Sequence, residues 1–282
     1  MRTPLIAAAA LVSLATGYPA AADHHTAGEM SHHNHAAMQA MESALSEANR
    51  SEDRTRDAYR HPAETLAFFQ VEPGMTVVDY MPAGGWYTRV LVPYLGSEGR
   101  YVGIMPDPAN ADNPRMAEYF GGLPGGFSES YPGWNLTGAP ISGYASGEVP
   151  EDMAGTVDRA LIFREMHNLH RSGVLHAELT RLRSMLKDDG MLGIVQHRAK
   201  ENAPASYTDG SKGYLRQKDV IALVEAHGFE LVDTSEVNAN PKDTANWENG
   251  VWELPPSLGS KREELKQIGE SDRMTLLFRK RA

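Results

Sequence analysis

Short apolar runs alternate along this chain with segments whose apolar residues recur at helical spacing. The strand-like runs are rich in β-branched residues and fall at 76–80, 100–105, 158–163 and 191–196. The helical patterns lie between or beside them, at 61–70, 86–95, 172–186 and 216–228. Strands that are apolar throughout are buried on both faces, which is typical of parallel sheets. The sequence therefore predicts an α/β fold, with an open parallel sheet covered by helices on both faces.

The later part of this alternation and its third strand are less regular. Residues 229–237 and 273–281 have strand character and are predicted to pair as the last two strands, separated by an insertion from about 238 to 271. Gly228 marks the end of the helix before them, because glycine tolerates the left-handed conformation that closes many helices. Residues 121–150 are rich in Gly, Pro and Ser and show no clear period, so the pattern does not locate a third strand.

Composition limits the possible functions. A chain of 282 residues with 41% hydrophobic residues can bury one sizeable core, so we expect one main domain with a tail. It has no cysteine, which excludes disulfides, thiolate catalysis and zinc-thiolate sites. The net charge is −10 and no basic residues cluster in the sequence, so nucleic acid is not an expected partner.

The first residues have the features of an export signal. Arg2 is followed by an apolar run at 5–17 that is too short to span a bilayer, and Ala20 to Ala22 suit a small-residue cleavage site. We predict cleavage after Ala22, a signal peptide at 1–22 and a periplasmic or secreted protein without a membrane span. The alternative is an uncleaved anchor.

A segment of different composition follows at 23–50. Five of the chain's 11 histidines fall in its first part, namely His24, His25, His32, His33 and His35. Neutral imidazole is a ligand for copper, nickel or zinc, so one interpretation is a divalent metal site on this leader. The other interpretation is a flexible acidic leader whose histidines are incidental. From Ala36 onward, Met38, Met41 and Leu45 have helical spacing and predict a short amphipathic helix.

The stretch VVDYMPAGGWYTRVL at 77–91 joins the first strand to the next helix through a Gly-rich turn. In an open α/β sheet, ligands bind beyond the carboxyl ends of the strands. Gly84 and Gly85 are predicted to let the backbone approach a nucleotide-type cofactor where a Cβ would collide. Trp86 and Tyr87 would stack on an adenine or an aromatic substrate. The alternatives are a simple turn for the glycines and ordinary packing for the two aromatic residues.

Histidines follow two neighbouring strands at the same edge of the predicted sheet. His167 comes after the fourth strand and His197 after the fifth, so both should overlook one crevice. Imidazole titrates near neutrality and can accept a proton from a nucleophile, which makes both residues catalytic candidates. Arg164, Glu165, Asn168 and Arg198 flank them and make the edge polar. A structural role for the histidines is the alternative.

Several longer stretches together resemble a known family over roughly residues 56–280. They are VEPGMTVVDYMPAGGWYTRVL, FREMHNLHR, LKDDGMLGIVQHR, VIALVEAHGFELV and ESDRMTLLFRK. The chain resembles class I S-adenosylmethionine-dependent methyltransferases, in particular an exported proteobacterial group of predicted methyltransferases. The resemblance implies a Rossmann-like sheet of seven strands with the last strand antiparallel. It also implies S-adenosyl-L-methionine as cofactor and a small-molecule methyl acceptor.

The chain departs from the family pattern at three positions. Asp79 matches the acid that ends the first strand, and Gly85 matches the last of three alternating glycines. Met81 and Ala83 stand in place of the first two. The acid that usually holds the ribose at the end of the second strand is also replaced by Met105. Asp107, two residues later, is either the substitute ribose ligand or a turn residue.

Three interpretations of function follow for a main domain at 51–282. The first is a working methyltransferase that binds S-adenosyl-L-methionine through Asp79, Gly84, Gly85, Trp86 and Asp107. The second is a repurposed or noncatalytic binding protein that uses the same crevice. The third is a periplasmic metal-handling protein that uses the His-rich leader.

Overall fold

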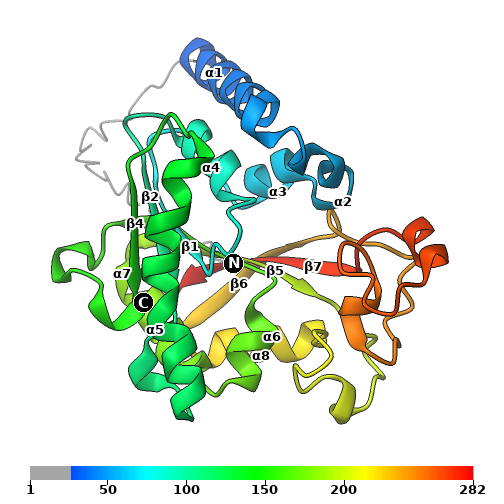
Figure 1. The fold of residues 1–282 in the computed structure, drawn as a ribbon. Coiled ribbons are helices and arrows are strands. Elements are labelled where there is room, and N and C mark those ends of the chain that lie inside the picture. Colours follow the sequence, from blue (N-terminus) through cyan, green and yellow to red (C-terminus); the bar gives the residue numbers. More distant parts are fainter. Residues whose placement is uncertain (1–26, 282) are drawn as a thin grey trace, which may run out of the picture. The chain divides into compact units, whose positions relative to one another are not determined.

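The fold is built on a single seven-stranded sheet in strand order β3-β2-β1-β4-β5-β7-β6 (Figure 1). The computed structural model describes residues 27–281, with side chains from residue 35 onward. The strands are β1 (Thr76–Tyr80), β2 (Arg100–Met105), β3 (Ile141–Ala145), β4 (Val157–Phe163), β5 (Leu186–His197), β6 (Phe229–Ser235) and β7 (Arg273–Lys280). Five strands pair in parallel, and β7 runs antiparallel to both β5 and β6. The predicted α/β sheet with its antiparallel last strand is confirmed.

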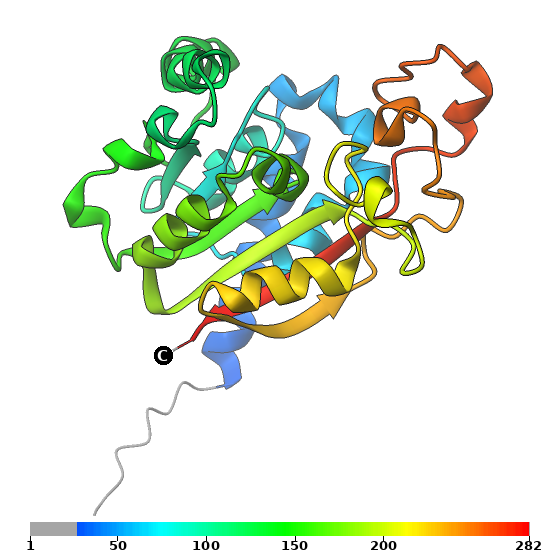
Figure 2. The ribbon, with the colours of Figure 1, turned by 90° about the horizontal axis from the view of Figure 1, so that it is seen from below.

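Helices cover both faces of this sheet, as predicted. Helices α3 (Pro62–Phe68) and α4 (Thr88–Leu95) pack on one face through an apolar cluster that includes Val77 of β1. Helices α6 (Met166–Arg171), α7 (Leu175–Met185) and α8 (Gln217–Ala226) pack on the other face, in the cluster that contains Val78. Figure 1 shows the two groups on opposite sides of the strands, and Figure 2 shows α8 in front of β6 and β7.

The chain divides into two units, of which the first is residues 1–36 and the second residues 37–282. The described part of the first unit is the beginning of helix α1 (Ala27–Ser46), which starts nine residues before the short helix that the sequence predicts from Ala36. In the second unit, Met41 and Ala44 of α1 are buried in the same cluster as α3 and α4. No helix of the described residues is both long and apolar enough to cross a membrane.

Short helices connect the larger elements. Helix α2 (Asp57–Arg60) precedes α3, and single 3-10 turns lie at 48–50, 53–56, 108–110, 131–134, 146–148, 151–153, 205–207, 250–253 and 263–267. The segment between β6 and β7 contains the last two of these turns and is otherwise irregular. It lies beyond the carboxyl end of β6, above the edge where the polar side chains of β4 and β5 gather.

One long helix, α5 (Pro114–Ser130), lies where the sequence pattern located no element. Its interior contains four glycines and Pro124, which disfavour a helix by propensity. Packing outweighs this low propensity. Phe120 is buried in the apolar cluster that contains Val78, and Phe127 is buried in the cluster that contains Val77. Gly103 and Gly143, paired across β2 and β3, lie directly under the Phe127 ring, and a Cβ at Gly143 would be 2.6 Å from it.

Candidate functional site

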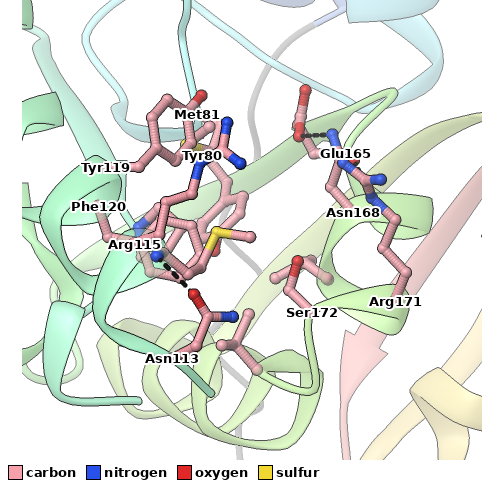
Figure 3. Close-up of a pocket in the computed structure, with 14 residues that line it drawn as sticks. Tyr80, Met81, Asn113, Arg115, Tyr119, Phe120, Glu165, Asn168, Arg171 and Ser172 are labelled. Carbon is pink, nitrogen blue, oxygen red and sulfur yellow. Dashed lines mark hydrogen bonds between the residues drawn. The ribbon is translucent and has the colours of Figure 1, made fainter. Parts of the chain in front are cut away.

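A cavity of about 700 Å³ lies at the carboxyl ends of β1, β2 and β4. The strand order changes direction between β1 and β4, and such switch points are the usual ligand sites of open α/β sheets. Figure 3 shows its two walls, with side chains of α5 on one side, side chains of α6 on the other, and Tyr80 and Met81 between them. The lining residues are Tyr80, Met81, Pro106, Asn113, Arg115, Met116, Tyr119, Phe120, Glu165, Asn168, Leu169, Arg171, Ser172 and Val174.

The wall that follows β4 carries the carboxylate of the cavity, and polar side chains lie on both walls. Glu165 is the carboxylate among the described lining residues, and its Oε2 accepts a hydrogen bond of 2.7 Å from Asn168 Nδ2. Burial raises the pKa of Glu165, and the hydrogen bond from Asn168 opposes that change. Arg171 and Arg115 are exposed at opposite sides of the cavity. The site therefore combines an aromatic and apolar interior with one carboxylate and a cationic rim.

The loop after β1 has a left-handed backbone at three alternating positions, two of which are not glycine. Met81 and Ala83 have φ values of 56° and 48°, and Gly85 has 72°. All three alternating positions are thus left-handed, a conformation that costs a residue with a Cβ about 1–2 kcal/mol. Met81 also lines the cavity, so its side chain occupies space beside the ligand position.

Gly84 and Gly85 differ in how closely other groups of this chain approach them. A Cβ at Gly85 would lie 2.4 Å from the Trp134 ring, so the close approach is to an indole of this chain. A Cβ at Gly84 would meet nothing within 4 Å. Neither glycine lines the cavity, and contact of this turn with a cofactor stays a prediction.

Asp79 is buried beneath the loop and does not line the cavity. Its Oδ2 accepts a hydrogen bond of 2.8 Å from the Tyr101 hydroxyl, which lies 2.8 Å from Thr88 Oγ1. Since the Tyr101 proton is donated to Asp79, Thr88 is the donor in the second bond. Burial raises the pKa of Asp79 from its ordinary 3.8 to about 7, although the Tyr101 hydrogen bond acts to lower it. The role of Asp79 shown by the structure is to join β1, β2 and α4.

Trp86 and Asp107 also lie outside the lining of the cavity. Trp86 is 7% exposed, meets Tyr87 edge-on, and has the Arg60 guanidinium 4.6 Å above its ring, which matches the packing alternative. Asp107 Oδ1 accepts a hydrogen bond of 2.8 Å from the Ala109 amide and caps the turn at 108–110. This hydrogen bond matches the alternative of a turn residue, and contact of Asp107 with a cofactor ribose stays a prediction.

His167 and His197 come together as predicted, with ring centroids 5.7 Å apart. Both are buried, and neither lines the cavity. His167 Nδ1 lies 3.4 Å from Gln196 Oε1, and His197 Nδ1 lies 2.6 Å from Ser271 Oγ. Burial lowers the pKa of His167 to about 4 and that of His197 well below its ordinary value. Both imidazoles are therefore neutral at pH 7.

No metal-binding group of three or more His, Cys, Asp or Glu residues exists among the residues that the structure describes. His24 and His25 lie outside the described residues, as does the signal segment at 1–22. His32 and His33 belong to the backbone of α1, and their side chains are not described. The structure thus gives the leader metal site no support.

Sequence reasoning missed the wall that α5 contributes to the cavity. Asn113 Oδ1 accepts a hydrogen bond of 3.0 Å from the Met116 amide, and Pro114 occupies the first helical position. An Asn-Pro pair of this kind is a helix start signal and was available in the sequence. The glycines that follow it conceal the helix, and with it the positions of Arg115 and Tyr119.

No protein-family model and no curated protein matches this chain. Among solved structures it is similar to a SAM dependent methyltransferase from Aquifex aeolicus, at 19% identity and a TM-score of 0.47, covering 65% of this chain and 87% of the other. It is similar to the 1,6-didemethyltoxoflavin-N1-methyltransferase of Burkholderia thailandensis, at 14% identity and a TM-score of 0.46, covering 95% and 94%. It is also similar to the [4+2]-cyclase SpnF, at 13% identity and a TM-score of 0.48, covering 79% and 80%.

The strand order of this chain defines its structural class independently of those similarities. A sheet ordered β3-β2-β1-β4-β5-β7-β6 with β7 antiparallel, helices on both faces and a cavity at the switch point is an open, Rossmann-like α/β fold. Fold alone does not fix activity, because one fold hosts several chemistries.

Proposed function

We propose that this protein is an exported S-adenosyl-L-methionine-dependent methyltransferase that acts on a small-molecule acceptor. The observation that carries the proposal is the cavity at the switch between β1 and β4. Its volume of about 700 Å³ lies within the roughly 300–1,000 Å³ typical of small-molecule sites.

The residues around the cavity suit an adenosyl ligand. Tyr119 and Phe120 provide aromatic surface against which a purine ring can pack. The Glu165 carboxylate can accept hydrogen bonds from neighbouring hydroxyls, as the ribose of this cofactor requires. Glu165 thereby replaces the acid that is missing at Met105. Arg171, on the same wall, supplies positive charge for an anionic group of the ligand.

The cofactor, when bound, supplies a methyl group already activated by a sulfonium, so the protein mainly has to align the acceptor. In this chain, side chains from α5 and α6 line opposite sides of the cavity, and the loop at 81–85 places Met81 in its wall. A wall that holds the ligand from both sides restricts its orientation, which is the main requirement of the reaction.

His167 is the proposed proton acceptor, with His197 beside it. Because neither imidazole lines the cavity, the proposal requires the methyl acceptor to extend from the cavity to the histidine pair. A neutral imidazole can take a proton from a nucleophile, but burial makes the resulting cation unfavourable. Since the pKa of His167 is about 4, its base form is almost fully populated above about pH 6. Turnover that depends on this base should be independent of pH from there to neutrality.

A noncatalytic binding protein is the second candidate, favoured by the side chain of Met81 in the wall of the cavity. In that case the same ligand binds without methyl transfer. Thermal shift and calorimetric titration with S-adenosylmethionine and S-adenosylhomocysteine test binding, and methyl transfer from labelled cofactor to small-molecule extracts tests turnover. Binding with no turnover would favour the second candidate over the first.

The Glu165→Gln variant tests the ligand site itself. It keeps the shape of the side chain and removes the negative charge, so we expect affinity for S-adenosylhomocysteine to fall at least tenfold, because hydrogen bonds to charged groups contribute about 1.5–3 kcal/mol. Glu151→Gln, on an exposed turn away from the cavity, is the matched control and should bind normally. Equal affinity of both variants, or no binding by the unaltered protein, would remove the proposed site.

Export is tested separately by mass spectrometry of periplasmic and culture fractions. We expect a mature chain that begins at Asp23. A chain that retains Met1 and stays with the cytoplasmic fraction would contradict export and leave the methyltransferase proposal standing.

A further inference from the structure

A cluster of arginines lies above the carboxyl ends of β4 and β5, outside the lining of the cavity. Three guanidiniums converge on one carboxylate, that of Glu270. Arg56 Nε lies 2.6 Å from Glu270 Oε1, Arg60 Nε 3.2 Å from Oε2, and Arg273 Nη1 3.1 Å from Oε2. Although burial alone would raise the pKa of Glu270, the three cations lower it to about 2. Glu270 is therefore ionised, and its charge is shared among three partners.

Positive charge in this cluster exceeds what Glu270 can neutralise. Arg60 is 1% exposed, and its Nη1 and Nη2 are buried without any hydrogen-bond partner among the described residues. Arg56 Nη2 is also buried and has no hydrogen-bond partner among the described residues. The Arg60 guanidinium also lies 4.6 Å above the Trp86 ring, so part of its charge faces an aromatic ring. Its N–H groups are still without a hydrogen-bond acceptor, which is unfavourable for a buried cation and would be relieved by an anion.

A fourth guanidinium, that of Arg164, adds to the excess. Arg164 directly follows β4, and its side chain makes no hydrogen bond or ion pair within the described residues from 35 onward. Burial is the largest cause of the lowered pKa of Arg60, and the charge of Arg164 is the next largest. The two cations therefore lie close together. The backbone of Arg164 is left-handed, with φ of 64°, and strain of this kind occurs at functional sites.

Two buried acids, Asp79 and Glu165, lie near Arg164. Burial raises the pKa of both Asp79 and Glu165, and for Asp79 it reaches about 7, so these carboxyls lose their protons less readily than exposed ones. Arg164 also acts to lower the pKa of His167 and His197, which places the histidine pair beside the cluster. The cluster and the proposed base thus lie on the same side of the sheet edge.

We propose that Arg56, Arg60 and Arg164 form a binding site for an oxyanion, the carboxylate or phosphate group of a small-molecule ligand. Carboxylate and phosphate oxygens accept charge-assisted hydrogen bonds from guanidinium N–H groups, and the planar geometry of guanidinium suits two such bonds at once. If this site holds the methyl acceptor, an inference that rests on the proposed function, the acceptor is an acidic molecule bound beside His167. The methionine carboxylate of the cofactor offers the same chemistry from a second source.

The first experiment uses inorganic phosphate as the probe and needs no cofactor. Thermal unfolding of the full protein is followed with rising phosphate against chloride at constant ionic strength. We expect phosphate to raise the melting temperature and Arg164→Gln to weaken phosphate affinity at least tenfold, with partial rescue in Arg164→Lys. Arg279→Gln, which removes an exposed arginine paired with Glu230, is the matched control and should keep the response.

Stability without phosphate gives an independent readout. Removing one of several like charges relieves repulsion, so Arg164→Gln should have a melting temperature in chloride equal to or above that of the unaltered protein. A lowered melting temperature with an unchanged phosphate response would mean that Arg164 is merely structural and would overturn the proposal.

A second experiment identifies the source of the oxyanion. Affinities for S-adenosylhomocysteine and for 5′-methylthioadenosine, which lacks the carboxylate, are compared in the unaltered protein and in Arg164→Gln. A tenfold loss confined to S-adenosylhomocysteine assigns the site to the cofactor carboxylate, whereas unchanged affinities together with lost phosphate binding assign it to the acceptor. Phosphate binding that survives in Arg164→Gln contradicts both assignments, and absence of all adenosyl binding contradicts only the proposed function.

Discussion

The Asp79→Asn variant should be less stable than the unaltered protein at low pH and should gain stability relative to it as the pH rises to about 8. Asp79 is 2% exposed, and its pKa is about 7 in the folded protein against 3.8 as its ordinary value. Between about pH 4 and pH 7 the folded state therefore holds a proton that the unfolded chain has lost. Stability falls as pH rises through this window, because the folded state binds more protons than the unfolded state.

The magnitude follows from the two pKa values of Asp79. Their separation of about three pH units corresponds to about 4 kcal/mol of unfolding free energy. Asparagine does not titrate, and its carbonyl can still accept the hydrogen bond from Tyr101. Its buried amide N–H groups would cost about 1–3 kcal/mol at every pH, so the change with pH is the diagnostic quantity.

The assay is urea unfolding of both proteins at several pH values between about 4 and 8. The stability difference between Asp79→Asn and the unaltered protein should grow in favour of the variant by up to about 4 kcal/mol across this window. Glu270 and His167 titrate in both proteins and cancel in the difference. Asp152→Asn, on an exposed turn, is the control for removing a carboxylate elsewhere in the chain. A difference for Asp79→Asn that stays constant or changes in the opposite direction would refute the assignment of a protonated, buried Asp79.

The remaining predictions concern the loop and the missed helix. Ala83→Gly should stabilise the protein by up to about 1 kcal/mol in urea unfolding, because it relieves a left-handed alanine at some cost in unfolded-state entropy. Gly85→Ala should destabilise it, since the new Cβ would meet the Trp134 ring at 2.4 Å, and equal stability would contradict that contact. Phe127→Ala should cost about 3–5 kcal/mol of unfolding free energy, whereas exposed Tyr119→Ala should cost little.

The sheet could be predicted from the sequence because each central strand is a short apolar run with its own boundary residues. The β1 and β2 runs were located at 76–80 and 100–105, the bounds that the structure gives. The third strand, Ile141–Ala145, was not located, because it lies at the sheet edge and contains Ser142 and Gly143. Its glycine is explained only by the Phe127 ring that packs on it, a contact between residues distant in sequence.

The candidate site was predictable in position and less so in composition. The carboxyl edge of β1 and β4 followed from the alternation of strands and helices, whereas the side chains that line the cavity depend on α5. The approach of His167 and His197 followed from adjacent parallel strands. Their burial did not, because it depends on residues from the segment before β7, such as Ser271, and on Trp252.

The arginine cluster shows why charge in a sequence is a weak guide to charge at a site. The chain as a whole carries −10, and its basic residues form no run that would have indicated anion binding. Arg60 and Arg273 are separated by more than two hundred residues, yet both contact Glu270, because α2 and the start of β7 lie at one edge of the sheet. A local excess of positive charge can therefore exist in an acidic protein. Salt screens exposed charges over about 10 Å and buried charges much less. The enclosed arginines, rather than the net charge of the surface, would therefore select an anionic ligand.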